Sequence, residues 1–183
     1  MKDPRSIRNL FWAVAVTAVF VSVQPMALSA QTKPAPAGGT FNLTKEVSDK
    51  KGAIVWKDAP SDAIPREVCT ILTACGGQNK LIALPAATEG GQKVGRGMFL
   101  SKSRDGKTDL IILLRQTYND RYFYLLGPDG NLQKAAFIQL GAKSWQPIAA
   151  ALVQPTFDKE KKAWHDHVLK LGAAPPAAAP QSN

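Results

Sequence analysis

Two histidines and two cysteines are the residues of this sequence whose types are best suited to chemistry. His165 and His167 are its only histidines, and they form a His-x-His pair. Such a pair can bind a metal ion from a strand or a loop. On a helix, however, the two side chains point about 200° apart and cannot face one ion. We therefore expect no metal site and no cofactor, and histidines that lie partly exposed on an amphipathic helix.

The cysteines, Cys69 and Cys75, favour a disulfide, because an even number of cysteines in an oxidising compartment usually pairs. Within a continuous helix their positions would differ by about 9 Å along the axis. A disulfide requires Cα atoms within about 6.8 Å of each other. The sequence therefore predicts one intramolecular bridge and a helix that ends before Cys75. The spacing also differs from the Cys-x-x-Cys of redox-active thiols, so we interpret the bridge as structural.

Basic residues provide the next candidate site. The sequence has a formal net charge of +9, and such an excess attracts anionic partners. Lys93 and Arg96 lie in the glycine-rich segment 90–97, which lacks the Gly-Lys-Ser/Thr ending of a phosphate-binding loop. Lys102 and Arg104 follow a few residues later. We predict that these four residues bind an anion, such as a lipid headgroup, a surface polysaccharide, a wall polymer or an acidic protein.

No set of residues in the sequence predicts catalysis. None of the serines lies in a Gly-x-Ser-x-Gly elbow. Asp105, Asp109 and Asp120 could act as paired carboxylates, but aspartates in such loops more often form turns. The aromatic and basic residues of segment 118–124 resemble the composition of single-stranded nucleic-acid binders. The signs of export described next argue against a nucleic-acid partner.

The first thirty residues have the order of a secretory signal peptide. Lys2, Arg5 and Arg8 precede the uncharged apolar run 10–23, and small residues follow up to Ala30. The apolar run is shorter than the roughly 20 residues of a membrane span. We predict cleavage after Ser29 or Ala30, a periplasmic or secreted protein, and no stable membrane span after processing.

Composition divides the rest of the chain into three parts. Residues 31–40 and 172–183 are rich in alanine, proline and other small residues, and cannot bury enough apolar surface to offset their ordering entropy. We expect a flexible linker and a disordered tail. Residues 41–171 are long enough for one domain with a single core.

Periodicity within 41–171 predicts an α+β fold. Segment 41–56 resembles a short hairpin or extended arm, and a helix follows with Pro65 in its first turn. Several short strands then span 81–140. Five consecutive aliphatic residues within 108–117 predict a central strand covered on both faces. Two helices come last: Pro155 ends the first, and the second carries Phe157, Trp164, Val168 and Leu171 on one stripe.

These elements predict an antiparallel β-meander of four to five strands with helices packed on one face. For function, we predict a small basic binding or accessory module without catalytic activity, whose partner is an anionic component of the cell envelope. One alternative is a small envelope hydrolase with His165 or His167 as its base. Another is an inner-membrane-anchored protein with an uncleaved signal. The binding module is preferred because no nucleophile, base and orienting group converge in the sequence. The sequence does not indicate an oligomeric state.

Overall fold

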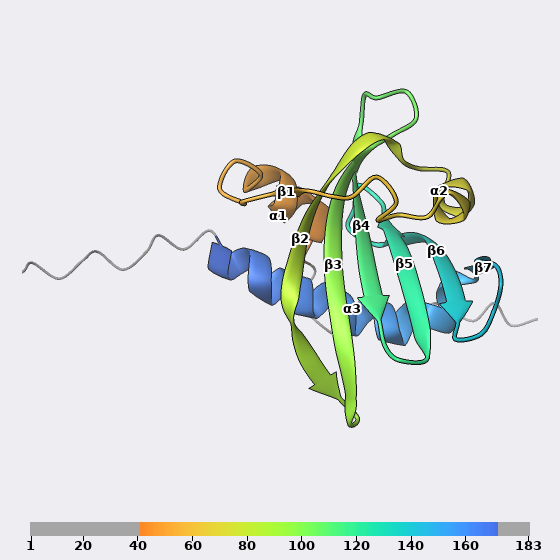
Figure 1. Ribbon diagram of the computed structural model, residues 1–183. Helices are drawn as coiled ribbons and strands as arrows, with labels where there is room; N and C mark the ends of the chain where they lie inside the picture. Colours follow the sequence, from red (N-terminus) through yellow and green to blue (C-terminus); the bar gives the residue numbers. More distant parts are fainter. Residues whose placement is uncertain (1–40, 172–183) are drawn as a thin grey trace, which may run out of the picture. The chain divides into compact units, whose positions relative to one another are not determined.

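The computed structural model describes residues 41–171. The predicted signal peptide, linker and tail lie outside these residues. Within them, seven strands form one antiparallel sheet whose spatial order follows the sequence (Figure 1). The elements in chain order are α1 (Leu43–Asp49), β1 (Lys57–Asp58), α2 (Arg66–Leu72), β2 (Gly76–Glu89), β3 (Gln92–Lys102), β4 (Asp109–Gln116), β5 (Asp120–Leu126), β6 (Leu132–Gln139), β7 (Gln146–Ile148) and α3 (Ala150–Leu171).

The α+β class and the antiparallel meander are thus confirmed, and the number of strands exceeds the predicted four to five. The first extra strand is β1, which pairs with Lys80 and Leu81 of β2 over only two residues. The other is β7, which occupies a segment predicted to be helical. Both extra strands lie at the edges of the sheet and are too short to show an alternating pattern of burial.

The meander separates the turns into two groups. The turns that join β2 to β3, β4 to β5 and β6 to β7 lie at one end of the sheet, the lower end in Figure 1. We call it the Tyr118 end, after the residue in its middle turn. The turns that join β3 to β4 and β5 to β6 lie at the opposite end, here called the Arg104 end.

The helices cover both faces of the sheet, so the prediction of helices on one face is wrong. One core cluster joins Leu43 of α1 and Trp164 of α3 to Met98 of β3; this side is called the α3 face. A second cluster joins Val68 of α2 to Phe99 of β3, and this side is called the α2 face. Because neighbouring strand residues point to opposite faces, an apolar strand such as β3 or β4 needs cover on both. This confirms the prediction that 108–117 forms a central strand.

Segment 41–56 contains a helix rather than the predicted hairpin or arm. The side chain of Asn42 accepts a hydrogen bond from the backbone N–H of Lys45, which is the geometry of an N-cap. Leu43 and Val47 lie four residues apart and are both buried against α3. A helix with only two buried positions gives little periodic signal, so the prediction of an extended segment missed it.

The C-terminal region forms one helix instead of two. α3 continues through Pro155, although proline removes a backbone donor and usually ends a helix. Val153 and Phe157 are buried on either side of this proline, whereas Pro155 itself is exposed. The packing of both flanks therefore keeps the helix continuous. Trp164 is fully buried in the core, as its place on the predicted stripe indicates.

The prediction of a helix that ends before Cys75 is confirmed. α2 ends at Leu72, and Thr73 and Cys75 both adopt left-handed backbone angles, with φ of 53° and 67°. The break brings the Cα atoms of Cys69 and Cys75 to 5.4 Å, and the two residues form a disulfide. Among residues 41–171, no helix is long and apolar enough to cross a membrane.

Candidate anion-binding surface

The four residues predicted to bind an anion do not converge in the structure. Lys93 lies near the start of β3, at the Tyr118 end, and Lys102 is the last residue of the same strand. They are nine positions apart along the strand, a distance of roughly 30 Å. Arg104 follows in the exposed turn between β3 and β4. One compact ligand cannot contact both ends of this strand.

Arg96 lies on the α3 face, and its guanidinium is enclosed by carboxylates. The side chain is 5% exposed, and its Nε donates to Glu160 Oε2 of α3 at 2.8 Å. Its Nη2 also forms an ion pair with Glu89 of β2. Both carboxylates belong to this protein, so Arg96 is occupied by internal partners.

Arg115 of β4 joins Arg96, Glu160 and Glu89 in one ion cluster. Strand pairing places Arg115 directly beside Arg96, and its Nε lies 3.3 Å from Glu160 Oε1. Its Nη1 lies 3.3 Å from Asp120 Oδ1. Burial raises the pKa of Glu160, and the hydrogen bond and charge of Arg96 act in the opposite direction. The five residues of this cluster connect β2, β3, β4 and β5 to α3.

The charges at the Arg104 end are arranged differently. Asp109 accepts ion pairs from Lys51 Nζ and Lys102 Nζ, each at 2.6 Å. Hydrogen bonds from Lys102 and Lys51 lower the pKa of the Asp109 carboxyl. Lys102 is therefore partly neutralised. Among the described residues, Arg104 has no carboxylate within ion-pair distance.

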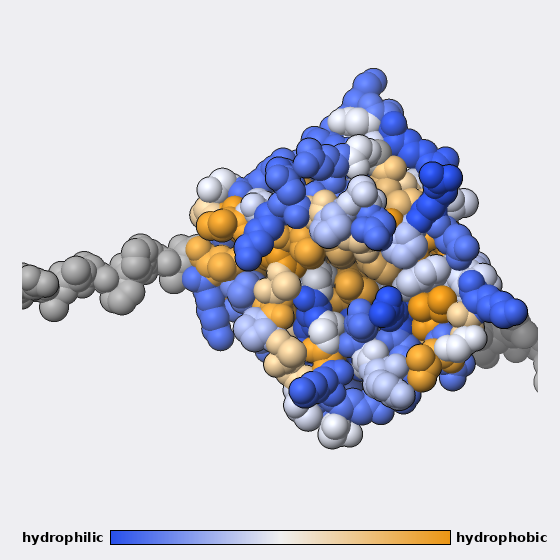
Figure 2. Space-filling model, viewed as in Figure 1, coloured by the Kyte–Doolittle hydropathy of each residue, from blue (hydrophilic) through white to orange (hydrophobic). Residues whose placement is uncertain are grey.

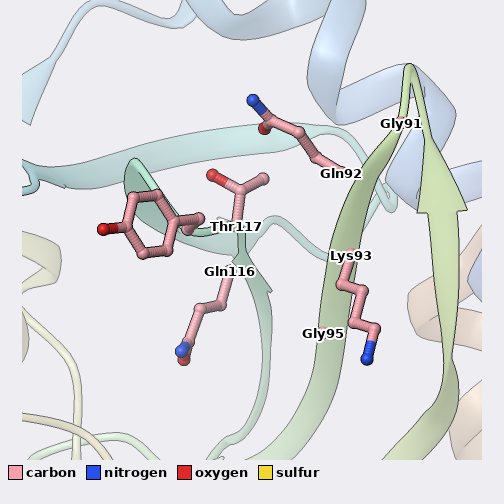
Figure 3. Close-up of a pocket in the computed structure, with 7 residues that line it drawn as sticks. Gly91, Gln92, Lys93, Gly95, Gln116 and Thr117 are labelled. Carbon is pink, nitrogen blue, oxygen red and sulfur yellow. The ribbon is translucent and has the colours of Figure 1, made fainter.

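Lys93 lies beside a surface hollow. A hollow of about 620 Å³ lies at the Tyr118 end, between the start of β3 and the end of β4 (Figure 3). It is lined by Gly91, Gln92, Lys93, Gly95, Gln116, Thr117 and Tyr118. Gly95 pairs with Gln116, and a Cβ atom at Gly95 would meet only Gln116 O, at 3.9 Å. The missing side chain at this position leaves the floor of the hollow open.

Arg121 is a functional candidate that the sequence-based prediction of the site missed. It pairs with Gln116 across β4 and β5, and strand alternation places it on the α2 face with Phe123 and Leu125. Side chains directly opposite each other on one face lie about 5 Å apart at their Cβ atoms. Lys93 and Arg121 thus lie on the same face at the same end of the sheet. Among residues 41–171, neither forms an ion pair.

The two histidines belong to different environments on α3. His165 Nε2 lies 3.1 Å from Glu46 Oε1 of α1, and its ring stacks on Phe41 at 3.7 Å between centroids. His167 packs edge-on against Trp164. Burial lowers the pKa of His167, and the charge of Lys170 acts in the same direction. Within the described part of the chain, no group of three or more potential ligands could hold a metal ion.

Comparison with known proteins does not assign the chain to a family. No family model matches the chain, and neither curated proteins nor solved structures give a match. The class that the observations define is therefore an α+β protein with a seven-stranded antiparallel meander, a disulfide beside α2, and an open basic surface at one end of the α2 face.

Proposed function

We propose that this protein is an exported binding or accessory module whose partner is an anionic component of the cell envelope. The observation that supports the proposal is the position of Lys93 and Arg121. They share the open part of the α2 face at the Tyr118 end, and neither has a carboxylate partner among residues 41–171. Cations without internal partners retain their full charge for an anionic ligand.

Polar groups around the two cations suit the same ligand class. Gln116 lies between the strands that carry Lys93 and Arg121, and strand alternation places it on the same face. Amide and hydroxyl groups can donate hydrogen bonds to phosphate, sulfate or carboxylate oxygens. The 79% exposed side chain of Tyr118 adds an aromatic surface at the rim. Charge, donors and an aromatic ring together favour an anionic headgroup or an acidic polymer.

The hydrolase alternative receives less support from the geometry. His165 lies beside a carboxylate, which resembles a base and its orienting group. Its ring, however, is stacked on Phe41 and hydrogen-bonded to Glu46 in the contact between α1 and α3. In the described structure, neither a hydroxyl nor a thiol group donates a hydrogen bond to it. His165 is better explained as a link between the two helices.

Export and a periplasmic or secreted location are part of the proposal. The disulfide between Cys69 and Cys75 supports an oxidising compartment, because reducing compartments keep thiols free. The N-terminal pattern of residues 1–30 supports export independently. An uncleaved signal that anchors the protein at the inner membrane is the competing arrangement. Sequencing the N-terminus of exported protein separates the two: Ala30 or Gln31 supports cleavage, and Met1 supports the anchor.

A pair of charge-matched variants tests the binding site. Each of the double variants Lys93→Gln/Arg121→Gln and Arg104→Gln/Lys107→Gln removes two exposed cations. Binding to soluble dextran sulfate at low salt is measured by calorimetry. We expect the first variant to lose about tenfold in affinity, since each exposed ion pair contributes up to about 1 kcal/mol. The second variant should change by less than about threefold. Equal losses from both variants would contradict a defined site and indicate attraction by net charge alone.

A further inference from the structure

Two exposed apolar side chains lie beside the basic residues at the Tyr118 end. Tyr118 in the β4–β5 turn is 79% exposed, and Leu140, directly after β6, is 62% exposed. The backbone N–H of Leu140 donates to Asn119 O at 2.7 Å, which holds the two turns together. Within the described residues, these are two of only five large hydrophobic side chains that are strongly exposed. Their proximity is therefore a feature of this end and not of the whole surface.

Cations surround this apolar pair. Lys93 lies in the β2–β3 hairpin, Arg121 is the second residue of β5, and Lys143 is exposed in the turn that follows Leu140. In the structure of residues 41–171, none of the three has a carboxylate within ion-pair distance. Figure 2, which shows the α2 face, has patches of hydrophobic surface among hydrophilic side chains across this part of the molecule.

The carboxylates of the same turns do not cancel this charge. Glu89 and Asp120 are partly exposed, but both form ion pairs on the α3 face, Glu89 with Arg96 and Asp120 with Arg115. A further carboxylate, Glu67 of α2, lies at the β6–β7 turn, where it accepts a hydrogen bond from the backbone N–H of Trp145. The three turns of the Tyr118 end therefore combine two exposed apolar side chains with three exposed cations.

We infer that the anionic partner is the surface of a lipid bilayer, which the three turns of the Tyr118 end contact edge-on. This inference rests on the proposed function and names its ligand class. Tyrosine is enriched at membrane–water interfaces because its ring is apolar and its hydroxyl is polar. Exposed Lys and Arg residues are attracted to anionic headgroups. A polysaccharide would use the cations but offers no apolar phase for Leu140 in its exposed turn.

Vesicle binding by single variants tests the lipid assignment. Sedimentation with vesicles of phosphatidylglycerol and phosphatidylcholine is compared with sedimentation with phosphatidylcholine alone. Wild-type protein should bind only the anionic vesicles. Tyr118→Ser and Leu140→Ser should each lower the partition coefficient by about tenfold, because an inserted apolar side chain is removed from water. Leu152→Ser, which alters an exposed leucine on α3, should leave it unchanged.

The same proteins are then titrated with dextran sulfate, which carries charge but offers no apolar phase. Tyr118→Ser and Leu140→Ser should retain wild-type affinity for this polymer. Wild-type binding to dextran sulfate without binding to anionic vesicles would overturn the lipid assignment and leave the proposed function in place. Vesicle binding unaffected by either substitution would also overturn it. Unchanged binding of both ligands by Lys93→Gln/Arg121→Gln would instead contradict the proposed function itself.

Discussion

Two pairs of basic residues lie at the same end of neighbouring strands and have opposite roles. Arg96 of β3 and Arg115 of β4 face α3, where Glu160, Glu89 and Asp120 neutralise them. Lys93 of β3 and Arg121 of β5 face the other side, where they form no ion pair with any residue of 41–171. The first pair is held by internal ion pairs, and the second is available to a ligand.

The difference between the pairs follows from strand alternation. Lys93 and Arg96 are three residues apart, and an odd separation within a strand places side chains on opposite faces. Side chains in a loop follow no such alternation. Interpreting segment 90–97 as a glycine-rich loop therefore groups Lys93 and Arg96 in one site. The same glycine-rich segment in fact supplies both a structural arginine and an exposed lysine.

The largest expected effect tests the structural pair. Glu160 is 1% exposed on its side chain and lies against both arginines. Glu160→Gln would remove the charge of a buried carboxylate that lies between Arg96 and Arg115, and should lower the free energy of unfolding by about 3–5 kcal/mol. Urea denaturation followed by circular dichroism measures the change. A decrease in the free energy of unfolding of less than about 1 kcal/mol would show that the ion cluster does not stabilise the packing of α3 on the sheet.

The α2 side of the sheet depends on a covalent connection instead. Replacing both cysteines, Cys69→Ser/Cys75→Ser, should cost about 2 kcal/mol, because the bridge restricts a short loop in the unfolded chain. Thermal unfolding with and without reductant provides the measurement. The reduced wild-type protein should match the double variant. A wild-type protein that is insensitive to reductant would exclude this contribution.

A smaller effect is expected from pH at the Arg104 end. The pKa of Asp109 is lowered in the folded protein, chiefly by hydrogen bonds from Lys102 and Lys51. Its contribution to stability is therefore present above the ordinary pKa of 3.8 and is lost as the pH falls through the lower folded value. For a partly exposed pair this contribution is at most about 1 kcal/mol. Between pH 5 and pH 3, wild-type protein should lose more stability than Asp109→Asn; equal losses would exclude the ion pairs as a source of stability.

The smallest expected effect concerns the exposed pair. Lys93→Gln and Arg121→Gln should each change the free energy of unfolding by less than about 0.5 kcal/mol, because neither side chain has a partner to lose in the described structure. Arg96→Gln serves as the contrast and should be strongly destabilising. If Lys93→Gln or Arg121→Gln destabilised the protein as much as Arg96→Gln, the distinction between the two pairs would fail.

The sequence predicted the features that depend on local geometry. The six-residue spacing of Cys69 and Cys75 required a break in the helix, and the stripe through Trp164 indicated burial. The features that depend on contacts distant in sequence were missed. Pro155 remains within α3 because the sheet packs against both of its flanks, and Arg121 joins the surface of Lys93 only through the register of β4 and β5.

Mapping the contact surface by NMR is the most direct test of whether the anion-binding surface lies at the Tyr118 end. Backbone amide shifts of the isotope-labelled protein would be recorded during titration with soluble dextran sulfate. We expect changes in amide chemical shift to be concentrated in residues 90–95, 116–121 and 140–144, with little change in residues 103–108. Shifts centred on 103–108, where Arg104 and Lys107 provide two exposed cations, would contradict the assignment of the anion-binding surface to the Tyr118 end.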